Sequence, residues 1–327
     1  MRSISLFAAY ALAGLSLCAA FAAAPASAQT NAGKNLRLVV PFPPGGSADI
    51  LARLVGQEAA RIEKQSLVVE NRPGGGTVIA TEFVSRAAPD GTTLLIMANS
   101  FTINATLRRS LPYDPKASFS PICQLVVSPQ LLVVHEHAPW HSVAEFFAAV
   151  RAHPGEYSIA TVGPATTQHI AAEQLKLQAK LDLTYVAYPG GAPAVQALLG
   201  EHVTSVLTNY SELVEQLKSG TLRPLAVATA QRMPAYPDLP TLSESGVPGY
   251  QATAWFGVMA PARTPLNVIA ELETAFKGAM DVAAVTTRLN DIGLYPAVMC
   301  GPEFKEHVNQ QIDEYAKVIQ AAGIKGE

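Results

Sequence analysis

Short apolar runs alternate with helical patterns in the first hundred residues. The runs at 36–42, 66–71 and 92–99 are rich in Val, Leu and Ile and predict strands, whereas residues 48–62 and 77–87 repeat apolar positions with helical spacing. Strands that alternate with helices in this way predict parallel βαβ units, and therefore the α/β class.

The pattern changes at residues 123–136, where Ser128 and Pro129 divide two apolar runs. Alternation then resumes, and a proline-rich connection at 231–250 leads to a further strand at 255–265 and three helical stretches. The strands expected in this second region lie at 157–162, 181–188, 203–209 and 222–229. We therefore expect two similar α/β lobes, with the chain crossing between them near residues 123 and 245.

The first residues have the pattern of a secretory signal peptide. Arg2 precedes an apolar run at 6–24, and Ala26-Ser27-Ala28 forms an A-x-A cleavage site. We expect cleavage after Ala28 and a periplasmic protein. A lipid anchor at Cys18 is the alternative, although the preceding Leu17 is larger than lipidation signals prefer.

Charge and cysteine content narrow the class of protein. Without Arg2, 22 of the 23 basic residues remain against 26 acidic ones, a formal charge of 22 − 26 = −4. A nucleic-acid partner is therefore not expected. Cys123 and Cys300 remain after cleavage, and an oxidising compartment permits them to pair. A disulfide and two buried free thiols both stay open from the sequence.

Two strand–turn–helix junctions have the composition of an anion site. In the first, Gly45 and Gly46 allow close approach of a guest, and Ser47 is expected to cap the next helix. In the second, Gly163 makes the turn, Thr166 or Thr167 is the expected cap, and His169 follows in the first turn. Two helix N-termini that face each other can bind an anion without a cationic side chain.

Further turns repeat these signals in the second lobe. Gly190 and Gly191 precede Pro193 near a helix start. Downstream, Ser211 is expected to cap a helix at 211–218, and Gly220 to end it.

The chain resembles the Bug-type (TctC-like) extracytoplasmic solute-binding receptors of tripartite tricarboxylate transport systems over essentially all of its mature length. The motifs that carry the resemblance include VVPFPPGGSADILAR, VENRPGGG, TQHIAAEQL, YPGGAPAVQALLGEHV, SGTLRPLAVAT and AWFGVMAPARTP. The resemblance implies a two-lobed Venus-flytrap fold of the periplasmic binding proteins (type II-like), with a mixed, mostly parallel sheet flanked by helices in each lobe. The lobes are expected at 29–123 with 246–327, and at 124–245.

The resemblance also implies which residues contact the ligand. The expected set is Phe42, Pro43, Gly45, Gly46, Ser47, Asp49, Asn99, Ser100, Thr166, Thr167, Gln168, His169, Tyr188, Gly190, Gly191, Ala192, Asn209 and Phe256. One departure concerns ligand identity: Thr208 stands where family members usually have an acidic residue before Asn209. The turn after the Asn71-Arg72-Pro73-Gly74 sequence also differs from the usual pattern.

Other chemistries have weaker signals. Gly74-Gly75-Gly76 follows a strand, but Ile79 occupies the position of the third glycine of a dinucleotide fingerprint. Neither G-x-x-x-x-G-K-[ST] nor G-x-S-x-G occurs in the sequence. The most suggestive metal cluster, His135, His137 and His141, lies where a strand runs into a loop and solvated histidines are ordinary. We expect no enzyme activity, no cofactor and no metal.

The sequence thus predicts a monomeric periplasmic receptor that captures a small organic acid between its lobes and presents it to a membrane permease. A signalling receptor for a sensor's extracytoplasmic domain is the alternative. Plain mono- or dicarboxylates rank first as ligands, aromatic acids second and amino acids third. The ammonium of an amino acid requires an acidic partner, for which Asp49 is the remaining candidate.

Overall fold

The computed structural model describes residues 35–163, 165–321 and 323–324. The predicted signal peptide at 1–28 lies outside these residues. None of the helices in the described ranges is both long enough and apolar enough to cross a membrane.

The described chain alternates strands and helices through most of its length. The strands are β1 (Asn35–Val40), β2 (Ser66–Asn71), β3 (Thr93–Ala98), β4 (Phe119–His135), β5 (Ser158–Val162), β6 (Thr184–Tyr188), β7 (Ser205–Asn209), β8 (Leu222–Val227), β9 (Thr253–Pro261) and β10 (Tyr295–Cys300). The α-helices are α2 (Ser47–Ile62), α3 (Val78–Ser85), α4 (Asn99–Leu107), α5 (Val143–Ala152), α6 (Thr167–Ala179), α7 (Gly191–Leu199), α8 (Val214–Ser219), α9 (Leu266–Asp281), α10 (Ala283–Asp291) and α11 (Gly301–Ala321). Two short 3-10 helices, η2 (Gly75–Thr77) and η3 (Tyr210–Glu212), complete the elements. The α/β class predicted from the sequence is confirmed.

The strands join in the order β2-β1-β3-β9-β4-β7-β5-β6, with β10 and β8 also paired to β4. The β1–β2, β1–β3, β5–β6 and β5–β7 pairs are parallel, as expected for βαβ units. The pairs that involve β4 or β9 are antiparallel. The sheet is therefore mixed, with a parallel group toward each end of this order.

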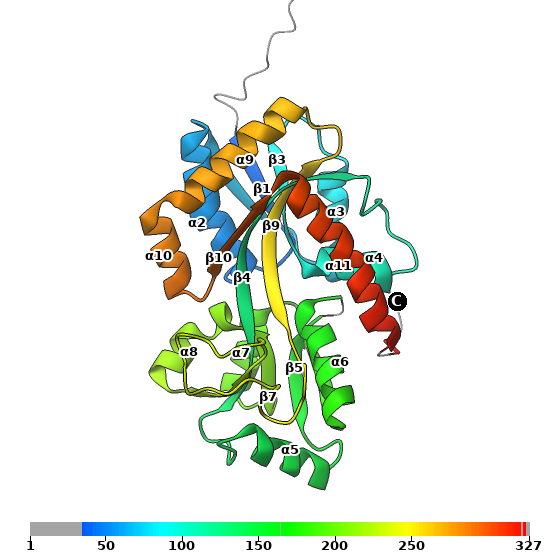
Figure 1. The fold of residues 1–327 in the computed structure, drawn as a ribbon, viewed down its shortest axis with the longest axis vertical. Helices are drawn as coiled ribbons and strands as arrows, with labels where there is room; N and C mark the ends of the chain where they lie inside the picture. The colour runs from blue at the N-terminus through cyan, green and yellow to red at the C-terminus, as the bar shows by residue number, and fades with distance from the viewer. Residues whose placement is uncertain (1–34, 164, 322, 325–327) are drawn as a thin grey trace, which may run out of the picture. The chain divides into compact units, whose positions relative to one another are not determined.

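Strand β4 connects the two groups (Figure 1). It runs beside β9 as far as the Pro129–Thr253 pair, and it pairs with β7 from Gln130–Asn209 onward. The sequence predicted two apolar runs divided by Ser128 and Pro129, but the structure has one strand of 17 residues. Proline lacks only the backbone donor, so a strand can continue through it where no ladder hydrogen bond is required of its nitrogen.

Helices cover both faces of each sheet region. Around β1, β3 and β9, one buried cluster includes Leu51 of α2 and Phe276 of α9, and another includes Phe304 of α11. Around β5 and β7, one cluster contains Leu175 of α6 and another contains Leu198 of α7. The burial of apolar side chains on both faces explains why these strands read as continuous apolar runs.

Two of the predicted helix caps are wrong. Helix α2 has Gly46 as its N-cap, without a side-chain cap, and Ser47 is already its first helical residue. Ser211 lies in η3 instead of capping α8. Both hydroxyls bond to partners distant in sequence, as described below. Thr166 does cap α6, and Gly220 ends α8 in the left-handed conformation.

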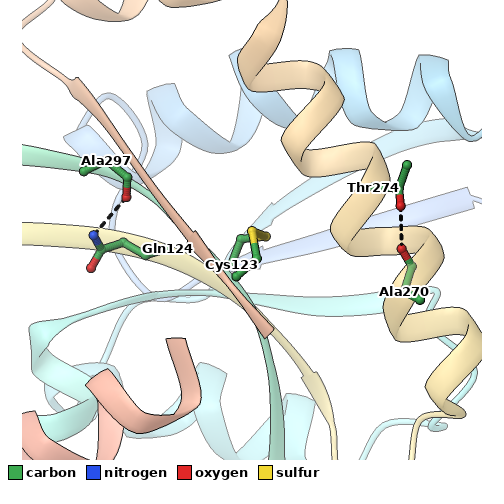
Figure 2. Close-up of a disulfide and its surroundings, with 6 residues drawn as sticks. Cys123, Gln124, Ala270, Thr274 and Ala297 are labelled. Carbon is green, nitrogen blue, oxygen red and sulfur yellow. Dashed lines mark hydrogen bonds between the residues drawn. A yellow bond between two sulfur atoms is a disulfide. The ribbon is translucent and has the colours of Figure 1, made fainter. Parts of the chain in front are cut away.

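A disulfide joins Cys123 of β4 to Cys300 at the end of β10 (Figure 2). The two residues are direct cross-strand partners, and the side-chain amide of Gln124 donates a hydrogen bond of 3.0 Å to the carbonyl of Ala297 beside them. The structure thus answers the question that the sequence left open, because these cysteines are not free thiols. The bond closes a loop with a sequence separation of 177 residues.

Replacing both Cys123 and Cys300 with Ala should lower the free energy of unfolding by about 2–4 kcal/mol, because the long loop is no longer constrained in the unfolded chain. Ligand affinity should be retained, since neither cysteine belongs to the turns expected to bind ligand. Denaturant unfolding and calorimetric titration measure the two quantities. A loss of affinity without a loss of stability would instead place the cysteines in the binding site.

Candidate functional site

A cavity lies where the N-terminal ends of α2, α6 and α7 meet the strands β7 and β9. It has about 500 Å³ of space not filled by protein, part of which opens to solvent. The lining residues are Phe42, Pro43, Pro44, Gly46, Ser47, Ala48, Ala98, Ser100, Val162, Thr166, Thr167, Gln168, Gly190, Gly191, Ala192, Pro193, Asn209, Glu212, Ala254 and Phe256.

The loop between β1 and α2 is held in shape by Asp49. Its carboxylate accepts hydrogen bonds from the Gly45 backbone N–H (3.0 Å) and from Asn71 Nδ2 (3.0 Å), and it forms an ion pair with Arg53 (2.9 Å). Burial raises the pKa of Asp49, but the hydrogen bonds from Arg53, Gly45 and Asn71 outweigh it and hold the pKa below its usual value. The Asp49 carboxylate therefore bonds to groups of the protein itself, and it does not line the cavity.

Ser47 connects the start of α2 to the segment that follows β7. Its Oγ lies 2.6 Å from Ser211 Oγ, accepts a hydrogen bond from Asn209 Nδ2 (3.2 Å) and donates one to Glu212 Oε1 (3.3 Å). Ser128 Oγ of β4 extends this network, since it lies 3.3 Å from Ser211 Oγ. The network explains why neither Ser47 nor Ser211 acts as a helix cap.

The start of α6 forms the opposite wall. Thr166 Oγ1 accepts a hydrogen bond from the His169 backbone N–H (3.3 Å), and it lies 2.9 Å from the carbonyl oxygens of Val162 and Gly163. Thr166, Thr167 and Gln168 are buried and line the cavity. The first turn of α6 therefore faces the cavity with hydroxyl and amide groups.

The loop before α7 completes the enclosure. Gly163 N–H donates to the Tyr188 carbonyl (2.9 Å), which ties this loop to the one before α6. A Cβ added to Gly190 would lie 3.3 Å from Pro43 Cδ, and a Cβ added to Gly191 would overlap the Glu212 carboxylate. Glycine at both positions therefore lets the loops approach each other closely.

The structure brings most of the predicted site residues together. Thirteen of the eighteen line the cavity: Phe42, Pro43, Gly46, Ser47, Ser100, Thr166, Thr167, Gln168, Gly190, Gly191, Ala192, Asn209 and Phe256. Gly45, Asp49 and Tyr188 instead support the surrounding loops through the contacts described above. His169 packs its ring against Tyr185 at 5.6 Å. Asn99 accepts a hydrogen bond from the Trp255 backbone N–H (2.9 Å).

Asn99 and Trp255 line a second cavity, which also includes Thr167 and Thr253. Successive side chains of a strand point to opposite faces. Accordingly, Ala254 and Phe256 of β9 line the first cavity, whereas Thr253 and Trp255 line the second.

The main residue that the sequence analysis missed is Glu212. It lies in η3, four residues after Thr208, and its Oε2 accepts a hydrogen bond from Thr208 Oγ1. Burial raises the pKa of Glu212, although hydrogen bonds from Thr208, Ser47 and the Asn209 backbone act in the opposite direction. Among the described residues that line the cavity, none is Lys, Arg or His, so Glu212 is the ionisable side chain of the lining.

The three histidines weighed as a metal signal, for which no metal was expected, are only partly brought together. His135 and His137 lie near Glu201, and one ligand atom from each falls within 4.8 Å of the others. His141 is not part of this group; its backbone N–H donates to Glu145 Oε2 at 2.6 Å.

Comparison with known proteins agrees with the fold. Residues 51–324 match the model of the tripartite tricarboxylate transporter family receptor. The chain is 31% identical to Protein BugT of Bordetella pertussis over 317 residues, which cover 96% of this chain and 97% of that protein.

Solved structures superpose over most of the chain. Rpa4515 of R. palustris with adipate has a TM-score of 0.86 at 33% identity, covering 90% of this chain and 99% of its own. MatC from Rhodopseudomonas palustris with bound malate has a TM-score of 0.81 at 32% identity, covering 88% and 99%. The periplasmic binding protein BugD has a TM-score of 0.86 at 29% identity, covering 90% and 99%. The chain therefore belongs to the tripartite tricarboxylate transporter receptor family, as a Bug-type (TctC-like) member with the two-lobed fold of periplasmic binding proteins.

Proposed function

We propose that this protein is a periplasmic receptor that captures a small organic acid in the cavity between its two lobes and delivers the acid to a membrane transporter. The observation that carries the proposal is the cavity itself, into which α6 directs its first turn of buried hydroxyl and amide groups. Backbone N–H groups at a helix start attract a carboxylate through the helix dipole, without a cationic side chain. The adipate and malate bound to two relatives support the same ligand class.

The proposed ligand-contacting residues are the thirteen predicted residues that line the cavity. They come from the β1–α2 loop, the starts of α2, α4, α6 and α7, and strands β7 and β9. Each proposed lobe contributes part of this set, with lobe boundaries near residues 123 and 245. The enclosed arrangement fits capture and release better than chemistry, and we assign no catalytic step to it.

Export, the transporter partners and the monomeric state are proposed from the family and the sequence. The signal-peptide pattern supports export with cleavage after Ala28. The family description supports the membrane subunits of a tripartite transporter as partners. We propose that the receptor meets them as a monomer.

An acid should bind more tightly than its own amide. Loss of the charge should cost on the order of 2 kcal/mol or more, as expected for charge-assisted hydrogen bonds. Calorimetric titration of each acid and amide pair under the same buffer conditions measures the difference. Equal affinity for both members would refute the carboxylate assignment while leaving the receptor fold intact.

Ligand binding should also close the protein. Because residues of both proposed lobes line the cavity, only a closed form contacts the guest from all sides. Small-angle scattering should therefore give a smaller radius of gyration at saturating ligand than without ligand. A radius that stays the same at saturation would contradict closure.

A further inference from the structure

Glu212 occupies the place where the N-terminal ends of two helices meet. Its Oε1 accepts a hydrogen bond from the first residue of α2, Ser47, and its Oε2 lies against the first residue of α7, Gly191. A Cβ on Gly46, the N-cap of α2, would lie 3.6 Å from the same carboxylate. A carboxyl group of the protein thus occupies a position that a helix dipole offers to an anionic ligand.

The start of α6 has a different environment. Thr166 caps this helix through a neutral hydroxyl, and Thr167 and Gln168 face the cavity from its first turn. No Asp or Glu other than Glu212 is present among the lining residues that the structure describes. A ligand carboxylate bound at the start of α6 would leave the other end of the ligand to face Glu212.

Among the lining residues that the structure describes, no cationic side chain lies beside the Glu212 carboxyl group. Arg53 is near the start of α2, but it forms a two-point contact with Asp49 and half of its side chain is exposed. Burial of Glu212 opposes its charged form and raises its pKa. A second carboxylate placed next to Glu212 would add like-charge repulsion, whereas a ligand cation would relieve the cost of burial.

We propose that Glu212 selects the ligand by charge, so that the cavity prefers a carboxylate with a cationic group at its far end over a dicarboxylate of the same length. This inference rests on the proposed function, since it takes the binding of one carboxylate as given. Family members usually have an acidic residue at the position of Thr208, so the sequence suggested that this acidic group was missing from the site. The proposal assigns its role in specificity to Glu212. It also places amino-substituted acids above the plain acids favoured by the sequence.

Two sets of matched ligands test the proposal by calorimetric titration on the mature protein. The first set is hexanoate, adipate and 6-aminohexanoate, and the second is butyrate, succinate and 4-aminobutyrate. Within a set, chain length is fixed and only the far end changes from apolar to anionic to cationic. The amino acid should bind about tenfold or more tightly than the diacid in at least one set, and the monoacid should fall between them.

The substitution Glu212→Gln should abolish this order by keeping the shape and removing the charge. The preference for the amino acid should fall about tenfold, and the diacid should bind more tightly than in the unaltered protein. Glu215→Gln is the matched control, because Glu215 lies on α8 outside the cavity and its exposed side chain pairs with Lys218 (3.7 Å). This control should retain the original order.

The outcomes separate the two proposals. If the diacid binds as tightly as the amino acid, or more tightly, in the unaltered protein, the charge selection by Glu212 is wrong while the carboxylate receptor stands. Diacid binding that strengthens at lower pH and loses this dependence in Glu212→Gln would show a shared proton, and would likewise overturn the selection. If no ligand of either set binds, the proposed function and the inference that rests on it both fail. The ranking in the unaltered protein decides the question even if Glu212→Gln does not fold.

Discussion

The pairing of β4 with β9 is the constraint on which the rest of the structure depends. β4 hydrogen-bonds to β9 from Phe119 to Pro129, then continues as the partner of β7 and β8 in the second sheet region. One uninterrupted strand therefore belongs to both regions, and the disulfide at Cys123 fixes it to β10. Because β9 is held in register beside it, the alternation along β9 decides which side chains reach each cavity. Phe256 reaches the proposed ligand site for this reason, and Trp255 does not.

A buried chain of hydroxyl groups links this strand to the cavity. Ser128 Oγ of β4 donates to the Gly293 carbonyl (3.0 Å) and lies within hydrogen-bonding distance of Ser211. Ser211 in turn contacts Ser47, which donates to Glu212. Since buried polar groups are costly unless they are paired, each member depends on the position of the next. The start of α2, η3 and β4 are thereby held in one arrangement at the site.

Local sequence patterns predicted the elements better than the contacts between them. Apolar periodicity placed β1, β2 and α2 close to their observed bounds, and the Thr166 cap needed only its own helix. Ser211 was assigned to a cap because a hydroxyl before a helix usually bonds locally. Its observed partner, Ser47, is 164 residues away, and local patterns contain no such information. The disulfide and the continuity of β4 through Pro129 likewise depend on strand register, which only the assembled sheet defines.

Glu212 is another site residue that local sequence patterns did not predict, and its position has a physical reason. The family resemblance leads one to expect an acidic side chain at position 208, and the structure places the Glu212 carboxylate in contact with the Thr208 hydroxyl instead. A carboxylate is thus present at this point of the site although the residue that supplies it lies four positions later. The two helix starts at Ser47 and Gly191 carry partial positive charge, which a negative group stabilises. The Glu212 carboxyl group occupies that position before any ligand arrives, and so the field that a ligand experiences depends on the charge of Glu212 as much as on the helices themselves.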